Sequence, residues 1–388
     1  MAKCALLPCD NYDYEQVRTA LQKAVTALGG FGPYIAPGER VLLKANLLMR
    51  KKPEDATTTH PVFVQALASL LIEHGASVVI GDSPGGPFTP VLMHAIYRST
   101  GMVAAAAASG ATLNTNFKSC ERENPRGVLA KRLTVTDMVN DVDKIITVAK
   151  LKTHAMMTYT GAVKNLFGLV PGIVKAEYHL NMSDYDYFAD MLVDVCQWAA
   201  PAMSFIDGIV GMEGHGPSSG TPARINVVMA GDSPYHLDQA ACHIIGLPTE
   251  EVPTLRRQKA RGLIGALDDI DFVCEHPNAF LMPDYEIVRG KTPLNLRESN
   301  LPESLKRLMG RHLQSRPVID HAVCNGCGIC REACPAHIID IKHCTQCDGR
   351  RRAFLKLSDC IRCYCCQELC PQKAIKVFKP RLARWLSL

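Results

Sequence analysis

Short apolar runs and longer amphipathic stretches alternate along the first part of the chain. Two runs, RVLLKANLL (40–48) and SVVIGD (77–82), are typical of buried strands. The stretch between them, HPVFVQALASLLIEHGA (60–76), predicts a helix that begins near Pro61 and ends near Gly75. Together the three segments predict a strand–helix–strand unit.

The same alternation continues further along the chain. Strands are predicted at DKIITVAKLK (143–152), MSFIDGIV (203–210) and RINVVMAGD (224–232), and a helix at YHLDQAACHIIG (235–246). Alternating strands and helices favour a mostly parallel sheet with helices on both faces. The predicted fold class of this part is therefore α/β.

Polar side chains follow several of the predicted strands. Ligands of parallel α/β sheets bind beyond the carboxyl ends of the strands, so these side chains predict a site at one rim of the sheet. The candidates for catalysis are Lys44, Lys152, His154 and Lys164, and those for substrate binding are Asn46, Asp82, Asn165, Asp207 and Asp232. Lysines near a histidine are suited to binding an anion or transferring protons.

Each of these residues also has a structural interpretation. Asp82 and Asp232 stand where helix caps and turns are expected, and the lysines are compatible with a solvated surface. The segment 151–172 is rich in Gly and Thr, which is typical of a functional loop but equally of a solvated one. The Gly-rich GIVGMEGHGP lacks the spacing of a dinucleotide-binding loop.

The length of 388 residues favours two units rather than one core. We expect an α/β domain over 1–316, whose part from 250 to 316 is less regular, a second domain over 317–379, and a tail over 380–388. In the less regular part, helices are predicted at RRQKARGLIGALDDI and ESLKRLMGRHLQ. No apolar stretch is long enough to cross a bilayer and the N-terminus does not resemble a signal peptide, so we expect a cytoplasmic protein without a membrane span.

Eleven of the seventeen cysteines lie within the last quarter of the chain. Two runs there have the spacing C-x2-C-x2-C-x3-C followed by proline, the spacing of bacterial ferredoxins that bind two 4Fe-4S clusters. Three cysteines of each run bind one cluster, and the fourth binds the other. The predicted ligands are Cys324, Cys327, Cys330 and Cys370 for one cluster, and Cys334, Cys360, Cys363 and Cys366 for the other. The alternative is zinc, which takes CxxC pairs separated by a longer gap.

Three cysteines of this region stay outside the predicted ligand sets. Cys365 is expected to pack, whereas Cys344 and Cys347 form a further CxxC that fits a redox pair, half of a metal site or no function. Residues 321–388 hold twelve Lys and Arg against five Asp and Glu, which alone would suggest nucleic acid. Thiolate-bound clusters offset much of this charge, so we expect no nucleic-acid partner.

Several motifs together resemble a known family. The segments VLLKANLL, TTTHPVFVQAL, GDSPGG, LKTHAMMTYTGAVKNLFG and CIRCYCCQELCP are similar to the family called domain of unknown function 362, in the form with a C-terminal two-cluster ferredoxin domain. The resemblance implies an iron–sulfur protein with an α/β domain and a small ferredoxin-like α+β domain. It implies no reaction.

The predicted function is an iron–sulfur oxidoreductase. Single electrons would pass through the two clusters to an unknown substrate or cofactor at the rim of the α/β domain, and the partner is a redox protein or a small molecule. One alternative is an electron carrier or a metal-cofactor assembly protein without turnover of its own. Another is a non-redox isomerase or ligase whose clusters are structural.

Overall fold

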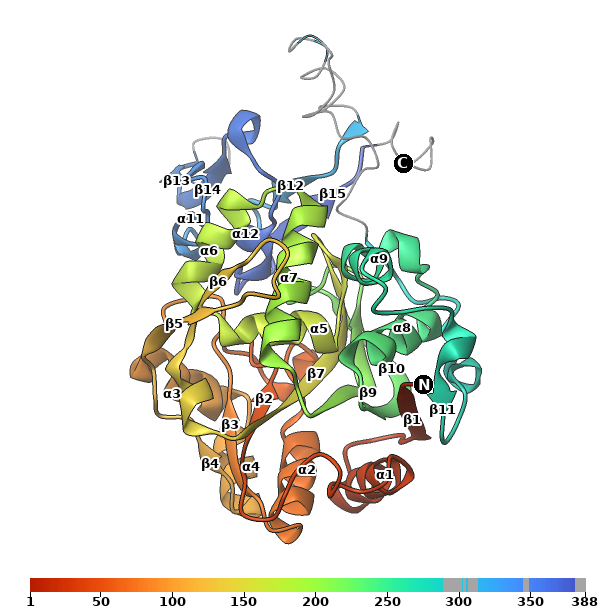
Figure 1. Ribbon diagram of the computed structural model, residues 1–388. Coiled ribbons are helices and arrows are strands. Elements are labelled where there is room, and N and C mark those ends of the chain that lie inside the picture. The colour runs from red at the N-terminus through yellow and green to blue at the C-terminus, as the bar shows by residue number, and fades with distance from the viewer. Residues whose placement is uncertain (289–301, 303–304, 306–312, 345–348, 381–388) are drawn as a thin grey trace.

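The computed structural model describes all residues except 289–301, 303–304, 306–312, 345–348 and 381–388 (Figure 1). Its main feature is a nine-stranded sheet with the strand order β11-β1-β10-β9-β7-β2-β3-β4, to which β8 is added beside β7. The strands are β1 (Lys3–Pro8), β2 (Arg40–Ala45), β3 (Ser77–Gly81), β4 (Thr112–Leu113), β7 (Lys144–His154), β8 (Thr158–Thr160), β9 (Met203–Glu213), β10 (Thr221–Gly231) and β11 (Asp271–Phe272).

The sheet is mostly parallel. Strands β9, β7, β2, β3 and β4 all run in one direction. Strand β10 runs antiparallel to both of its neighbours, β9 and β1, and β8 is antiparallel to β7. The predicted α/β class is confirmed, but β1, β4, β8 and β11 were not predicted, and neither was the reversed direction of β10.

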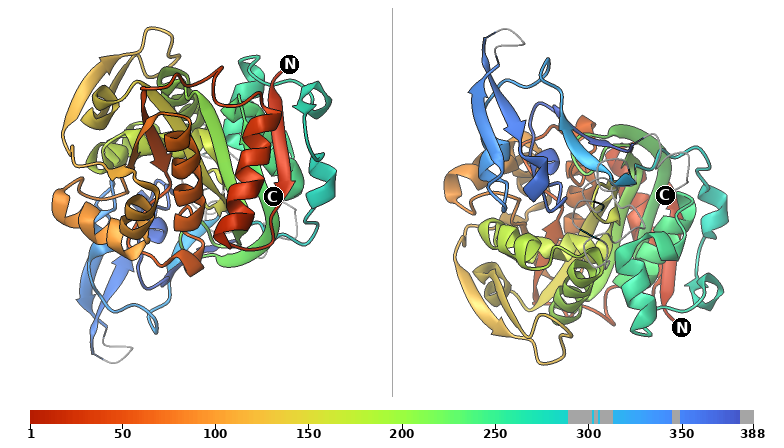
Figure 2. Two further views of the ribbon diagram at one scale, coloured as in Figure 1. Left: turned by 90° about the horizontal axis from the view of Figure 1, so that it is seen from below. Right: turned by 90° about the horizontal axis from the view of Figure 1, so that it is seen from above.

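Helices cover both faces of the sheet, as Figure 2 shows from two opposite sides. One face carries α1 (Tyr14–Ala27), α2 (Pro61–Glu73), α3 (Pro90–Ser99) and α4 (Met102–Ser109); the other carries α5 (Ala162–Asn165), α7 (Tyr185–Ala199), α8 (Pro234–Ile244) and α9 (Pro253–Ala260). Successive strand residues point to opposite faces, so Leu43 packs on the first face and Leu42 on the second.

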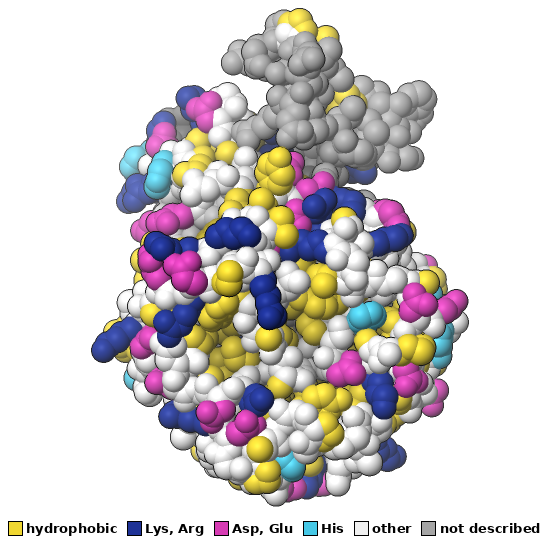
Figure 3. All heavy atoms as spheres, viewed as in Figure 1, with side chains coloured by type: hydrophobic (Ala, Val, Ile, Leu, Met, Phe, Trp, Pro, Cys, Tyr) yellow, Lys and Arg dark blue, Asp and Glu magenta, His cyan; other side chains and the backbone are white. Residues whose placement is uncertain are grey.

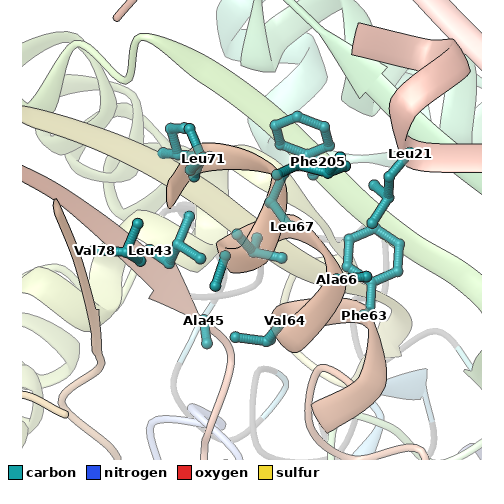
Figure 4. Close-up of a cluster of buried hydrophobic side chains, with 14 of the residues drawn as sticks. Leu21, Leu43, Ala45, Phe63, Val64, Ala66, Leu67, Leu71, Val78 and Phe205 are labelled. Atoms are coloured by element: carbon teal, nitrogen blue, oxygen red, sulfur yellow. The ribbon is translucent and has the colours of Figure 1, made fainter. Parts of the chain in front are cut away.

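The helix predicted between the first two parallel strands is α2, and the residues at its start explain why it begins there. Pro61 occupies its first turn, where the missing N–H costs nothing, and the His60 side chain accepts a hydrogen bond from the N–H of Val62. Its apolar face packs on β2 and β3, with Leu67 and Leu71 near Leu43 (Figure 4). The core thereby fixes the end of β2, where the first candidate site residues stand.

Two short antiparallel sheets form the C-terminal region (blue in Figure 1). Its elements are β12 (Arg316–Ile319), α11 (Ile329–Glu332), β13 (Ile339–His343), β14 (Arg351–Leu355), α12 (Cys365–Glu368) and β15 (Ile375–Phe378). Strand β12 pairs with β15, and β13 pairs with β14. Helix α12 begins 36 residues after α11, and β15 begins 36 residues after β13. The region is therefore an internal structural repeat.

The C-terminal region packs on the second face of the α/β part. Tyr364 and Val377 are buried in one hydrophobic cluster with Tyr185 and Phe188 of α7. Figure 1 shows the region above α7 and α6 (Gly172–Asn181). The division at residues 316 and 317 stays a prediction.

Other expectations from the sequence are met only in part. Of the helix predicted at 256–270, only α9 forms, and it ends before Gly262, whose φ of 68° is suited to ending a helix. The helix predicted at 303–314 and the tail at 380–388 lie mostly outside the described residues. A hairpin not predicted from the sequence consists of β5 (Ser119–Glu123) and β6 (Arg132–Thr136). Among the described residues, no helix has the length and apolar character to cross a membrane.

Candidate functional site

A cavity of about 300 Å³ lies between the rim of the sheet and the C-terminal region. Seven of the nine predicted rim residues line it: Lys44, Asn46, Asp82, Lys152, His154, Lys164 and Asn165. The opposite wall is formed by residues of α11 and α12 and the positions that directly follow them: Ile329, Glu332, Ala333, Cys365, Glu368 and Leu369. The cavity thus joins the two parts of the chain.

The structure does not bring Asp232 to this cavity. Because β10 is antiparallel to β9, its last residue Gly231 pairs with Ser204 near the start of β9. Asp232 therefore lies at the end of the sheet opposite to the rim, near the start of β9, where it accepts a hydrogen bond from the N–H of Lys3. A rim position for Asp232 would require β10 to run parallel to β9, and the two strands are antiparallel.

Asp207 belongs to a separate buried cluster. Its carboxylate forms an ion pair of 2.6 Å with Lys150 and accepts hydrogen bonds from Tyr12 Oη and from the N–H of His60. Lys150 and Asp207 are 1% and 0% exposed. These contacts join β7, β9, the segment before α1 and the start of α2, so the observed role of Asp207 is to connect elements.

A continuous polar network runs along the rim side of the cavity. Lys44 forms an ion pair with Asp82 at 2.7 Å and donates to the carbonyl of Ala45 at 2.8 Å and to Asn165 Oδ1 at 2.9 Å. Asn46 links Asn165 to Lys152, which donates to Asn46 Oδ1 at 2.8 Å.

Lys152 differs from Lys44 in having no carboxylate partner among the described residues. Its second acceptor is the carbonyl of Thr57 at 2.7 Å, so one N–H group is left for the cavity that it lines. Burial lowers the pKa of Lys152 from its ordinary value to about 7. Burial also lowers the pKa of Lys44, although the carboxylate of Asp82 opposes this shift.

The segment 151–172 is not the solvated loop that was one expectation. It continues β7, turns back as β8 and enters α5, and nearly all of it is buried. The carboxylate of Asp238 on α8 accepts hydrogen bonds from the N–H groups of Ala162 and Val163 and from Tyr159 Oη. This carboxylate fixes the start of α5 and hence the positions of Lys164 and Asn165.

His154 presents one unsatisfied ring nitrogen to the cavity. Its Nδ1 atom accepts from the N–H groups of Met156 and Met157, which leaves the proton on Nε2. Nε2 is buried and has no hydrogen-bond partner among the described residues; its nearest acidic atom is Oε2 of Glu368, at 3.7 Å. Burial and the nearby Lys164 lower the pKa of His154, so the ring is neutral near pH 7.

Helix α6 adds residues that the sequence analysis missed. Lys175 and His179 both line the cavity, and Lys175 donates to the carbonyls of Ser83 and Pro84. Burial lowers the pKa of Lys175 to about 7 and that of His179 to about 3. The Phe167 ring lies 5.7 Å from the ammonium groups of both Lys164 and Lys175. No helix was predicted from the sequence at Gly172–Asn181, so these two residues were not among the candidates.

Two glycines permit the close packing of the cavity wall. A Cβ atom on Gly168 would lie 2.0 Å from Asp82 Oδ1 and 2.3 Å from Lys44 Cε. A Cβ atom on Gly172 would lie 2.0 Å from the carbonyl oxygen of Gly86. The backbone approaches both places so closely that no larger residue fits.

The eight predicted cluster ligands surround two further cavities in the C-terminal region. Each cavity is lined by four of them, and the grouping follows the predicted exchange of the fourth cysteine. The first is lined by Cys324, Cys327, Cys330 and Cys370, the second by Cys334, Cys360, Cys363 and Cys366. Burial and the neighbouring thiols raise the pKa of Cys330 to about 11, so its thiolate form requires a compensating cation. Four thiols around one cavity are the ligand type that a 4Fe-4S cluster requires, and the binding of a cluster in each cavity stays a prediction.

The loops around these cysteines repeat their backbone conformation as well. Gly326 and Gly328 have φ values of 68° and 88°, and Arg362 and Tyr364, 36 residues later, have 59° and 60°. Left-handed residues turn successive N–H groups toward one side, which suits hydrogen bonding to cluster sulfurs. Non-glycine residues in this conformation are uncommon and point to function.

Neither Cys344 nor Cys365 lines one of the two thiol-lined cavities. Cys365 lines the large cavity beside Glu368. Cys344 is buried and disulfide-bonded, and Cys347 lies outside the described residues. A redox role for the Cys344 and Cys347 motif stays a prediction.

An α/β protein with a cysteine-lined C-terminal region is the class that the fold and the site define. The chain belongs to the family described as domain of unknown function (DUF362), which matches residues 41–243. Residues 317–340 match the 4Fe-4S binding domain (Fer4), so the resemblance to the ferredoxin-bearing form of the family is confirmed and 4Fe-4S binding is indicated.

Two known proteins are similar to this chain. The thylakoid-associated protein sll1697 of Synechocystis is 30% identical over 316 residues, which cover 78% of this chain and 92% of the relative. The lactate racemase apoprotein from Thermoanaerobacterium thermosaccharolyticum is 11% identical with a TM-score of 0.39, over 63% of this chain and 56% of that chain.

Proposed function

We propose that this protein is an iron–sulfur oxidoreductase whose substrate binds in the large cavity between the rim and the C-terminal region. One observation carries the proposal. The cavity wall opposite Lys152 and His154 is formed by α11 and α12, and these helices contain Cys330 and Cys366. A bound molecule would touch the same two helices that hold cysteines of both thiol-lined cavities.

The eight cysteines are proposed as ligands of two 4Fe-4S clusters, in the two sets given above. Such clusters supply transfer of single electrons. A redox protein would deliver the electrons one at a time, and reduction of an organic substrate by two of them takes up two protons as well. The residues of this chain would bind the substrate, exclude water and provide the protons.

Lys152 is the best-suited proton donor. A group whose pKa lies near 7 exchanges its proton readily at neutral pH, and the buried ammonium group of Lys152 has this property. Asn46 and the carbonyl of Thr57 hold its Nζ atom in place, and Nε2 of His154 offers a second N–H group. Lys44 is a positioning residue, because its ammonium group is held by the ion pair with Asp82 and by hydrogen bonds to Ala45 and Asn165.

Contacts between the two parts of the chain keep the cavity walls together. Gln367 of α12 donates to the carbonyl of His215 at 2.7 Å, and Ser218 Oγ donates to the carbonyl of Glu368 at 2.6 Å. Tyr185 Oη donates to the carbonyl of Arg362 at 3.0 Å. These bonds position α12 at the cavity and support a direct route from the cysteine region to the substrate.

The test is reoxidation of the reduced protein under anaerobic conditions, followed by the visible absorbance of the clusters in a stopped-flow instrument. Candidate acceptors are screened with the parent protein, and the Lys152→Met and His154→Ala variants are then compared using an acceptor that reacts. We expect reoxidation at least about tenfold slower in both variants, a barrier increase of about 1.4 kcal/mol. The exposed Lys118→Met is the control. Equal rates in all four proteins would show that this cavity is not the substrate site.

The electron-carrier alternative predicts a different result. A carrier would exchange electrons with a partner protein at rates that do not depend on Lys152 or His154. No small acceptor would then distinguish the parent from the variants.

A further inference from the structure

The charge balance of the large cavity is uneven. Four lysines line it, Lys44, Lys152, Lys164 and Lys175, together with three carboxylates, Asp82, Glu332 and Glu368. Of these four lysines, Lys44 alone forms an ion pair with another described residue, Asp82. Glu332 is exposed at the outer edge of the cavity, and the nearest nitrogen to Glu368 belongs to His154. Lys152, Lys164 and Lys175 thus face the cavity without a carboxylate contact.

Burying ammonium groups without a negatively charged partner is costly, and the lowered pKa values express this cost. Burial is the largest cause of the lowered pKa of Lys152, Lys164 and Lys175. A negatively charged ligand would replace lost hydration with direct ion pairs. The cavity therefore gains more from an anion than from a neutral molecule of equal size.

A second observation, independent of charge, points to the same ligand chemistry. Nε2 of His154 carries an N–H group that is buried at the cavity and has no acceptor among the described residues. The hydroxyl of Ser83, which also lines the cavity, is buried without a partner in the described residues. A ligand with acceptor oxygens would satisfy both groups.

The rest of the lining limits what such a ligand looks like. Phe167, Ile173 and Leu369 supply apolar surface, and a volume of about 300 Å³ is at the small end of ligand sites. We propose that the substrate is a small organic anion, with a carboxylate or phosphate group bound by Lys152, Lys164, Lys175 and His154 and an apolar body against Phe167. This inference rests on the proposed function only in calling the ligand a substrate.

Binding is tested without turnover, by calorimetric titration of the anaerobically purified, cluster-loaded, oxidised full chain. The probes are benzoate and phenyl phosphate, with uncharged benzamide as the matched control for size and shape. We expect at least one anion to bind at least about tenfold more tightly than benzamide, or about 1.4 kcal/mol. The tighter of the two anions assigns the group as carboxylate or phosphate.

Variants locate the binding. Lys164→Met keeps the length of the side chain and removes its charge, and we expect affinity for the preferred anion to fall at least about tenfold. Lys175→Met provides a second, independent variant if Lys164→Met folds poorly, as judged by circular dichroism. The exposed Lys118→Met should bind like the parent. Equal binding of benzamide, failure of both anions to bind, or unchanged affinity in both cavity variants would overturn the inference.

The result separates this inference from the proposed function. Tight anion binding without reoxidation by any anionic acceptor would refute the oxidoreductase proposal and leave the anion site standing. Rapid reoxidation by an uncharged acceptor, at a rate that depends on Lys152, would leave the oxidoreductase proposal standing and refute the anion site.

Discussion

Nε2 of His154 at the end of β7 lies 3.7 Å from Oε2 of Glu368 at the end of α12. This approach brings the sheet rim and the cysteine-bearing region to one point, although the two residues are more than two hundred positions apart in sequence. On one side of Glu368 is Cys366 and on the other Cys370, and these cysteines line different thiol cavities. Glu368, which lines the large cavity, therefore lies in the sequence between two cysteines that are predicted to bind clusters.

Neighbouring cysteines of α12 are expected to differ sharply in their effect on iron content. Cys366 lines a thiol cavity, whereas Cys365 lines the large cavity. Cys366→Ser should reduce bound iron from about eight to about four atoms per chain or fewer, and Cys365→Ser should leave about eight. Iron and acid-labile sulfide are measured on anaerobically purified protein. Equal losses in the two variants would contradict the ligand assignment, and serine at both Cys344 and Cys347 should cause no loss.

Removal of the Asp238 carboxylate should destabilise the protein strongly. Asp238→Ala leaves the N–H groups of Ala162 and Val163 and the hydroxyl of Tyr159 buried without their acceptor. At about 1–3 kcal/mol for each unsatisfied group, we expect the free energy of unfolding to fall by about 3 kcal/mol or more. Urea unfolding measures the change. The partly exposed Asp232→Ala is the control, with a loss under about 1 kcal/mol; equal losses would contradict the capping role.

Anion affinity should fall as the pH rises from 6 to 8. Burial lowers the pKa values of Lys152 and Lys175 to about 7, so both ammonium groups are mostly charged at pH 6 and mostly neutral at pH 8. The charged groups around them in the cavity are Lys44, Lys164, Asp82 and Glu368. Because a bound anion favours the charged lysines, binding at pH 8 should take up protons, which calorimetry in two buffers of different ionisation enthalpy detects. Constant affinity without proton uptake would contradict the assignment.

The same shifts have a consequence for stability. A lysine with a folded pKa near 7 and an unfolded pKa near 10.5 binds fewer protons in the folded state between these values. The free energy of unfolding should therefore increase with pH between these two values, because the unfolded state binds more protons there. In Lys152→Met, the contribution of this lysine to the slope should disappear.

An added methyl group at Gly168 should disturb the cavity from within its wall. In Gly168→Ala, the Cβ atom would lie 2.0 Å from Asp82 Oδ1 and 2.3 Å from Lys44 Cε, so the ion pair has to move. We expect a lower melting temperature and at least about a tenfold loss of anion affinity, as for other displaced binding groups. At Gly32, a Cβ atom would meet nothing within 4 Å, so Gly32→Ala should leave both properties unchanged. An unaffected Gly168→Ala would show that the wall is not rigid.

Some of the site could be predicted from the sequence, because its chemistry follows from local spacing. The lysine within VLLKANLL is conspicuous in an apolar strand, and a buried ion pair with Asp82 accounts for it. The two cysteine sets could be predicted from residue spacing alone, and the structure groups the thiols in the same way.

Other features depend on the tertiary fold and left no signal in the sequence. An antiparallel strand in a buried sheet has the same apolar pattern as a parallel one, so the direction of β10 and the position of Asp232 could not be predicted. Lys175 lies on α6, and its surroundings come from segments that are distant in sequence, the turn at 83–86 and the C-terminal region. Polar surface in this neighbourhood is visible in Figure 3, where Lys and Arg side chains cross the face below the C-terminal region.

The two halves of the cysteine region share a backbone course but differ in what they present. Cys327 in the first loop is exposed, whereas Tyr364 in the second loop, at the position equivalent to Gly328, is buried in the hydrophobic cluster beside α7. The two copies of this repeat therefore differ in their exposure to solvent. The exposed cysteine Cys327 therefore belongs to the first copy, and the residue packed against the α/β part, Tyr364, belongs to the second.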